Sequence, residues 1–180
     1  FALWSDKEGS GADWFFGQRQ TSSTGKYLHI GYNSATSFKF AFYGQDIVVP
    51  VTDDQETWIH WAGTYDVDTG VRVLYKNGVE VAQDTSPAFS GSGDFIIGGL
   101  TGASYSGKLD DVRIYDKALS AREVLEFMSK KKPDQEEGLI GHWTFDIASD
   151  STASDVSGNG KDGVISGTVI RINSTTPVAT

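Results

Sequence analysis

The chain contains no cysteine, so neither a disulfide framework nor a thiolate metal site can be built from it. Basic residues are also scarce, since 15 Lys and Arg stand against 24 Asp and Glu and give a formal net charge of −9. Phosphate binding needs a basic face, so we expect no nucleic-acid partner and no attraction to an acidic membrane surface. No run of about 18 apolar residues occurs, so we expect no membrane insertion.

The length of 180 residues favours one domain that can bury a core without disulfides. Residues 1–15 show no signal-peptide pattern, and Phe1 to Trp4 read as the middle of a strand. We therefore expect a segment of a larger protein.

What the chain does have is glycine, 21 residues of it, and short alternating apolar segments between clusters of Gly, Ser, Asn and Asp. This pattern is typical of a β-sandwich or barrel. The predicted strands are Asp13–Arg19, Tyr27–Tyr32, Phe38–Tyr43, Asp46–Val49, Thr57–Tyr65, Val71–Lys76, Val79–Gln83, Phe95–Ile97, Lys108–Tyr115, Gly138–Phe145 and Gly163–Ile172.

Two of these predictions carry further detail. Bulky residues stand on both faces of Thr57–Tyr65, which predicts a central strand. Asn77-Gly78 between two alternating segments predicts a hairpin with a type I′ turn, which needs positive φ at both central positions.

One segment breaks the β pattern. Ser120–Lys132 has Val124, Leu125 and Met128 at helical spacing, and Ser120 precedes Glu123 by three residues, as in a capping box. We predict one short helix that ends before Pro133.

Three groups of residues form a more specific pattern: Leu109–Tyr115 with Lys117–Val124, Thr57–Asp66 with Leu74–Val79, and Gly138–Asp146 with Asp155–Gly163. Together they resemble the closing strand and helix, the central strand and hairpin, and the opening strand and first loop of laminin-G-like domains in the concanavalin A-like lectin/glucanase superfamily. The resemblance implies an all-β fold, a jelly-roll sandwich of two antiparallel sheets.

The order of these groups differs from the family, because the opening segment stands at the C-terminal end of the chain. Residues 138–172 either belong to a second, tandem domain or complete the sandwich begun at residue 1, as in a circular permutation. A sandwich without its first strands leaves an open edge, and residues 138–172 fall below the roughly 40 residues that can bury a core alone. We therefore predict a single domain over residues 1–180, with 138–172 supplying the opening strands.

The resemblance also implies a structural calcium ion. In the family, an Asp and an Asn of the first loop often meet the first Asp of the closing strand at one cation. Carried over, these are Asp155, Asn159 and Asp110, with Asp111 as a substitute. Calcium prefers six to eight oxygen ligands, and this Gly-rich loop offers carboxylate, amide and backbone oxygens. The alternative is a Gly/Asn turn whose acids are only solvated.

Glycan binding is the second hypothesis, because sugars stack their apolar faces on aromatic rings. The candidate platforms are Trp4, Trp14, Tyr43 and Tyr105, with Trp61 considered beside them. Filling the core is the competing role for each of these rings.

Catalysis finds little support. His29, His60 and His142 show no zinc-binding spacing, and Asp110-Asp111 are chain neighbours whose side chains point to opposite faces of a strand. The sequence also lacks GxSxG and GxxxxGK[ST] motifs. We expect no enzyme, and a glycoside hydrolase or lyase is the least supported alternative.

The combined prediction is a secreted or cell-surface recognition module within a larger protein, stabilised by calcium. Its expected partner is a glycan, or an extracellular surface protein that it adheres to. A protein-interaction or spacer module is the other function that these observations leave open.

Overall fold

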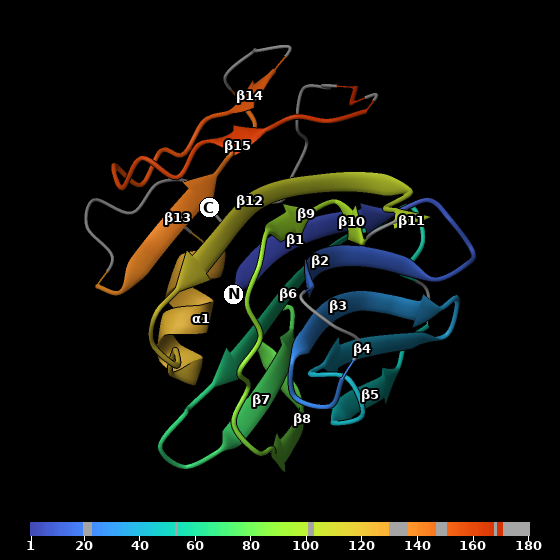
Figure 1. Ribbon diagram of the computed structural model, residues 1–180. Helices are drawn as coiled ribbons and strands as arrows, with labels where there is room; N and C mark the ends of the chain where they lie inside the picture. Colours follow the sequence, from blue (N-terminus) through green and yellow to red (C-terminus); the bar gives the residue numbers. More distant parts are fainter. Residues whose placement is uncertain are drawn as a thin grey trace.

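The computed structural model has two antiparallel β-sheets and one short helix (Figure 1). It describes residues 1–19, 23–52, 54–100, 103–129, 137–146, 151–167 and 169–170. The elements are β1 Ala2–Lys7, β2 Asp13–Arg19, β3 Tyr27–Ser34, β4 Ser37–Ala41, β5 Asp46–Pro50, β6 Trp58–Tyr65, β7 Val71–Lys76, β8 Val79–Thr85, β9 Phe95–Ile97, β10 Gly99–Leu100, β11 Ala103–Ser104, β12 Gly107–Tyr115, α1 Ala121–Met128, β13 Leu139–Trp143, β14 Thr152–Ala153 and β15 Gly163–Val164.

The larger sheet has six strands in the order β13-β12-β1-β6-β7-β8, and the smaller has five in the order β5-β4-β3-β2-β9. Two short pairs, β10-β11 and β14-β15, stand beside them. This arrangement confirms the predicted all-β sandwich of two antiparallel sheets with one helix.

The hydrophobic core fills the space between the two sheets. The predicted central strand is confirmed, because β6 lies between β1 and β7 and buries both of its faces. Trp61 of β6 stacks on Phe38 of β4, with 3.7 Å between ring centroids and 9° between planes. The fully buried members of this core, each with an exposed fraction of at most 1 %, are Leu3, Phe15, Phe16, Ile30, Tyr32, Phe38, Trp61, Leu74 and Val112.

Helix α1 gives the six-stranded sheet a second, smaller core on its other face. Ser120 caps the helix, and the Ser120–Glu123 capping box is present as predicted. The rings of Tyr115 and Phe127 stack with centroids 5.5 Å apart. The helix ends at Met128, and residues 130–136 of the expected helix and linker lie outside the described part of the chain.

The β7–β8 hairpin has the predicted turn. Asn77 has φ of 50° and Gly78 of 77°, so both central positions take the left-handed conformation. The Asn77 side chain also accepts a hydrogen bond from the backbone N–H of His60 at 2.9 Å, which ties the turn to the central strand.

The C-terminal segment joins the larger sheet through one strand. β13 pairs antiparallel with one side of β12, and β1 pairs with the other side, so β13 is the edge strand of this sheet. The strand predicted over Gly163–Ile172 is wrong in extent among the described residues, because β15 covers Gly163–Val164, pairs with the two residues of β14, and does not continue through 165–167 or 169–170. Residues 168, 171 and 172 of that prediction lie outside the described part of the chain. Without a longer neighbour the apolar pattern is not buried, and Val164 is 89 % exposed. The circular permutation itself stays a prediction.

Candidate functional site

Four rings gather on the outer face of the five-stranded sheet, and we call them the aromatic patch: Trp14 of β2, Tyr27 and His29 of β3, and Tyr43 of the β4–β5 turn. His29 lies at the centre. Its ring centroid is 5.1 Å from Trp14, 5.3 Å from Tyr27 and 6.3 Å from Tyr43. Tyr27 and Tyr43 lie nearly parallel at 6.0 Å. Trp14 and Tyr27 are half-buried, and Tyr43 is 41 % exposed.

Strand alternation brings these side chains to one face. In β3, Ile30 points into the core, so Tyr27 and His29 point outward. In β2, a bulge between Trp14 and Phe16 lets Phe15 and Phe16 both reach the core while Trp14 stays outside.

Small residues flank the central histidine. His29 pairs with Gly17 of β2 on one side and with Ala41 of β4 on the other. The β10–β11 hairpin approaches β2 here, since a Cβ added to Gly17 would lie 2.1 Å from the Leu100 side chain. The Leu100 side chain therefore covers the space beside His29, which is 8 % exposed.

Tyr43 holds an unusual backbone conformation. It has φ of 52° and Gly44 has φ of 73°, so this pair makes a tight turn of type I′ sense closed by the Phe42 N–H to Gln45 carbonyl hydrogen bond at 3.1 Å. Asn or Gly is the usual first residue of such a turn, and a bulky residue there is strained. Strain of this kind is often kept where a side chain has a function.

The polar groups of the patch are an imidazole and an ion pair. Burial lowers the pKa of His29, although nearby Asp46 and the Tyr27 carbonyl act to raise it. His29 is therefore neutral at pH 7. Its Nδ1 lies 3.4 Å from the carbonyl oxygen of Tyr27, a contact that makes Nδ1 the donor and leaves Nε2 as an acceptor. Beside it, Lys39 Nζ and Asp46 Oδ2 are 3.0 Å apart.

Sequence reasoning found half of this patch. Trp14 and Tyr43 were predicted as ligand-binding residues, and the structure brings them together. Tyr27 and His29 were missed, although the alternation of Leu28 and Ile30 with them already places both on the outer face of a half-buried strand.

The other predicted platforms lie elsewhere. Trp4 is 6 % exposed and meets the ring of His60 edge to face at 5.2 Å on the larger sheet. Tyr105 packs on the core against Phe15, with 5.1 Å between centroids. Trp61 is wholly buried and donates from Nε1 to the Tyr32 hydroxyl at 3.2 Å. Trp4 and Trp61 are therefore buried, whereas Tyr105 is half-buried and lines the cleft described next.

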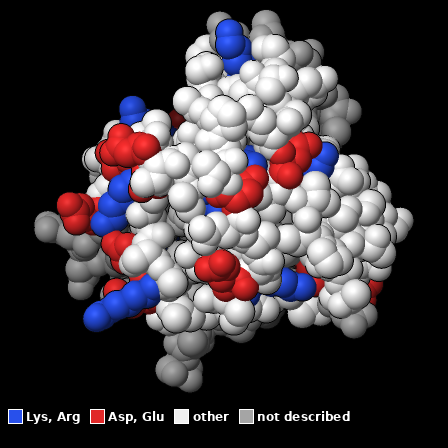
Figure 2. Space-filling view, turned by 90° about the horizontal axis from the view of Figure 1, so that it is seen from below, with Lys and Arg blue, Asp and Glu red and all other residues white. Residues whose placement is uncertain are grey.

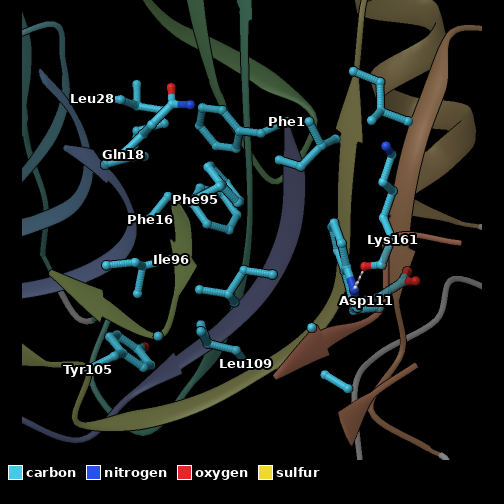
Figure 3. A pocket seen from close by; sticks show the side chains of 18 of the residues that line it. Phe1, Phe16, Gln18, Leu28, Phe95, Ile96, Tyr105, Leu109, Asp111 and Lys161 are labelled. Atoms are coloured by element: carbon cyan, nitrogen blue, oxygen red, sulfur yellow. Dashed lines mark hydrogen bonds between the residues drawn. The ribbon is translucent and has the colours of Figure 1, made fainter. Parts of the chain in front are cut away.

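A cleft of about 2140 Å³ opens between the two sheets on the side of β9, β12 and β13 (Figure 3). Phe1, Phe16 and Phe95 point into it from β1's start, β2 and β9, and Leu109 from β12. These rings pack against one another, since the ring centroid of Phe16 lies 5.5 Å from that of Phe1 and 5.2 Å from that of Phe95. The rings thus extend the core into the cleft, and Gln18, Asp111 and Lys161 also line it and bring polar groups to its wall.

The residues predicted to bind calcium fall into two groups. In the first loop, Asp155 accepts hydrogen bonds from the backbone N–H groups of His142, Ser157 and Lys161, each at 2.9 Å. Burial acts to raise the pKa of Asp155, but these hydrogen bonds together outweigh it and hold the pKa below its usual value. Asn159 Nδ2 donates to the Leu139 carbonyl at 2.8 Å. Both side chains fasten the loop to β13.

The second group lies on β12. Asp111 has φ of 54°, and its carboxylate lies between His142 Nε2, at 2.5 Å, and Arg113 Nη2, at 2.9 Å. Arg113 also donates to the carbonyl of Phe127 at 2.6 Å, so this buried network joins β12, β13 and the end of α1. Asp110 is buried at 9 % exposure beside it.

These donors fit a cation only in part. The described residues hold no group of three or more His, Asp or Glu side chains that could bind a metal ion. A calcium ion would depend on the remaining lone pairs of Asp155, on Asp110, on the Asn159 amide oxygen and on backbone carbonyls. The calcium site stays a prediction.

The sequence of the chain matches a known protein family. The profile of a family described as "Concanavalin A-like lectin/glucanases superfamily" matches residues 2–125. The chain belongs to this superfamily. Its match covers more than half of the chain, and it confirms the family resemblance seen in the sequence. No curated protein sequence matches the chain.

Solved structures of similar fold include proteins that were determined with a bound sugar. A protein from Bacteroides ovatus, provisionally described as carbohydrate binding, shares 22 % identity with this chain at a TM-score of 0.72. The match covers 89 % of this chain and 50 % of the Bacteroides ovatus chain. Domain 4 of an extracellular arabinanase from Geobacillus stearothermophilus, in complex with arabinotriose, shares 22 % at 0.52, covering 70 % of this chain and 64 % of that one. A sialidase carbohydrate-binding module from Ruminococcus gnavus, bound to α2,3 sialyllactose, shares 14 % at 0.53, covering 69 % and 79 %. At these identities the likeness establishes the fold alone.

Proposed function

We propose that the chain is a non-catalytic carbohydrate-binding module and that glycans bind to the aromatic patch. The observation that carries the proposal is the gathering of Trp14, Tyr27 and Tyr43 around a neutral His29 on the solvent side of a rigid sheet. Sugar rings stack on aromatic faces while neighbouring polar groups read their hydroxyls. The sugar ligands of the structural neighbours support the same class of function.

The test is isothermal titration against a panel of oligosaccharides, repeated with Trp14→Ala. We expect binding to the natural chain and a loss of at least tenfold with Trp14→Ala. The matched control is Trp58→Ala, because Trp58 is a half-buried tryptophan of β6 on the other sheet. A panel that binds equally well to all three proteins would refute the site, and a panel that binds to none would refute the function.

The absence of catalysis is part of the proposal. A glycosidase needs two carboxylates about 5–10 Å apart in a cleft. In the proposed site Asp46 is the acidic side chain, and Lys39 engages it. Asp111 of β12 was the other carboxylate considered for catalysis, and it is engaged in contacts with His142 and Arg113. A bound oligosaccharide should therefore be recovered intact after long incubation.

A protein-interaction role is the second candidate, because an apolar surface lies at the β7–β8 turn. Val79 and Val81 of the edge strand β8 are exposed, as is Leu125 of α1, which packs on Gly78. Edge strands with apolar side chains are surfaces where partners add. Cross-linking that depends on Val79 and not on Trp14 would favour this role.

We further propose that the module works outside the cell as part of a larger protein, with residues 138–172 belonging to the same unit and a calcium ion at the 155–159 loop. The β12–β13 pairing supports the shared unit. Among the described residues no helix is both long and apolar enough to span a bilayer.

A further inference from the structure

The charges beside the aromatic patch define the class of glycan that it can take. Lys39 of β4 is the cationic side chain that the described residues bring to the patch, and it faces Asp46 of β5. The Nζ–Oδ2 distance is 3.0 Å, and the two side chains are 18 % and 24 % exposed. Such partly buried pairs are screened less than fully exposed ones. Lys39 is thus already engaged.

The pair lies next to the central imidazole. Asp46 is opposite Ala41, and Ala41 is opposite His29, so the three residues form one row across β5, β4 and β3. Asp46 and Lys39 act on the charge of His29 in opposite directions, and burial keeps the imidazole neutral. The described polar groups around the rings therefore carry no net charge.

We infer that the patch binds uncharged glycans and discriminates against anionic ones such as sialosides, an inference that rests on the proposed function. A carboxylate on the ligand needs a cation as its partner, and here it would have to displace Asp46 from Lys39. It would also approach Asp46 itself and a chain with a net charge of −9. The charged side chains visible in Figure 2 likewise mix both signs on the face seen from below.

A neutral sugar meets the opposite situation. The ammonium of Lys39 has three donors and the carboxylate of Asp46 two acceptor oxygens, of which the ion pair uses one each. A hydroxyl group both donates and accepts, so adjacent hydroxyls bind to both members of the pair without separating them. The superfamily fold accommodates both ligand classes, because one neighbour holds arabinotriose and another sialyllactose. The side chains on the fold therefore decide the class.

The test pairs ligands that differ in charge. Lactose and α2,3 sialyllactose, together with an uncharged panel of longer oligosaccharides, are titrated against the natural chain, Asp46→Asn and Lys39→Met. We expect uncharged ligands to bind the natural chain more tightly than their sialylated counterparts. Asp46→Asn leaves the ammonium of Lys39 unpaired, so this variant should bind sialyllactose about tenfold more tightly than the natural chain does. Lys39→Met leaves the carboxylate of Asp46 unpaired, so this variant should bind sialyllactose more weakly than the natural chain does.

The possible failures are distinguishable. Sialyllactose that binds the natural chain more tightly than lactose, and loses that binding with Trp14→Ala, overturns the inference and leaves the proposed function standing. Equal sialyllactose affinity in the natural chain and in Asp46→Asn also overturns it. Absence of any binding that depends on Trp14 overturns both. Circular dichroism and thermal melting of each variant show that the fold is kept.

Discussion

The phenol rings of Tyr27 and Tyr43 lie side by side on the solvent face of the five-stranded sheet, 6.0 Å apart and inclined by 23°. Tyr27 sits in a regular strand, whereas Tyr43 reaches this position only because its backbone takes φ of 52°. A turn residue without a large ring would fit the same backbone with less strain. The pairing of the two rings is thus obtained at a cost in stability.

Replacing Tyr43 with Asn should separate stability from binding. Asn is well suited to the left-handed position of this turn, so we expect Tyr43→Asn to raise the free energy of unfolding by about 1 kcal/mol. The same change removes a ring from the aromatic patch and should weaken glycan binding several-fold. Urea denaturation and titration calorimetry measure the two effects.

Tyr43→Phe serves as the matched control, because it keeps the ring and loses only the hydroxyl. It should leave stability near that of the natural chain and retain most of the binding. If Tyr43→Asn gained stability and bound glycans as before, Tyr43 would have no part in recognition.

Much of the fold follows from local patterns that tertiary packing does not oppose. The central strand β6, the Asn77-Gly78 turn and the Ser120–Glu123 cap were predicted because each depends on neighbours in sequence. The pair β10–β11 and the strand β14 were missed, since two-residue strands leave no period to detect. The long strand predicted over Gly163–Ile172 failed because an apolar pattern needs a neighbouring strand, which sequence alone does not supply.

The site was harder to predict than the fold. An aromatic residue in a strand has the same pattern whether it fills the core or faces solvent, and only the register decides. Trp4 and Trp14 show this, since one is covered on the larger sheet while a bulge leaves the other half-buried on the outer face of the smaller. The Lys39–Asp46 pair joins two strands through the β4–β5 turn, and no spacing in the sequence identifies it as part of a site.

The ion pair between Arg72 and Asp84 should be the most sensitive polar contact in the larger sheet. The buried guanidinium donates to both carboxylate oxygens, at 2.9 and 2.6 Å, and also to the carbonyl of Gln45 at 2.8 Å. Lysine cannot make this fork, so Arg72→Lys should lower the free energy of unfolding by about 3 kcal/mol. Arg122→Lys, at an exposed pair with Glu126, should leave the melting temperature unchanged.

Helix α1 should lose stability in acid through Glu123. Its carboxylate binds Lys117 Nζ at 2.8 Å and accepts from the Ser120 N–H and hydroxyl, and these contacts, Lys117 first, lower its pKa to about 2. Because this folded-state pKa lies below the unfolded value of 4.5, the stabilisation is complete above pH 4.5 and is lost as pH falls toward 2. We expect a loss of about 1 kcal/mol across this range.

Glu123→Gln keeps the shape of the cap and removes its titration. Urea denaturation of both proteins at pH 5 and pH 2 should show a smaller loss of stability for Glu123→Gln than for the natural chain. An equal loss in both proteins would assign the acid sensitivity to other carboxylates.

Calcium should raise the melting temperature if the 155–159 loop binds it. A ligand that binds only the folded chain stabilises it in proportion to RT ln(1 + [L]/Kd), so chelation with EDTA should lower the midpoint and calcium should restore it. Magnesium should not substitute, since it requires a tighter octahedral shell than a loop of mixed backbone and carboxylate oxygens provides.

Asp155 cannot test the metal by itself, because it already holds the loop through three backbone N–H groups and its loss would destabilise the chain with or without calcium. Asp110 is tested by how its own variant responds to calcium. If it is a ligand, Asp110→Asn should melt at the same temperature in EDTA and in calcium, whereas the natural chain should melt higher in calcium. A natural chain that melts at one temperature in calcium and in EDTA would mean that hydrogen bonds alone hold the loop against β13.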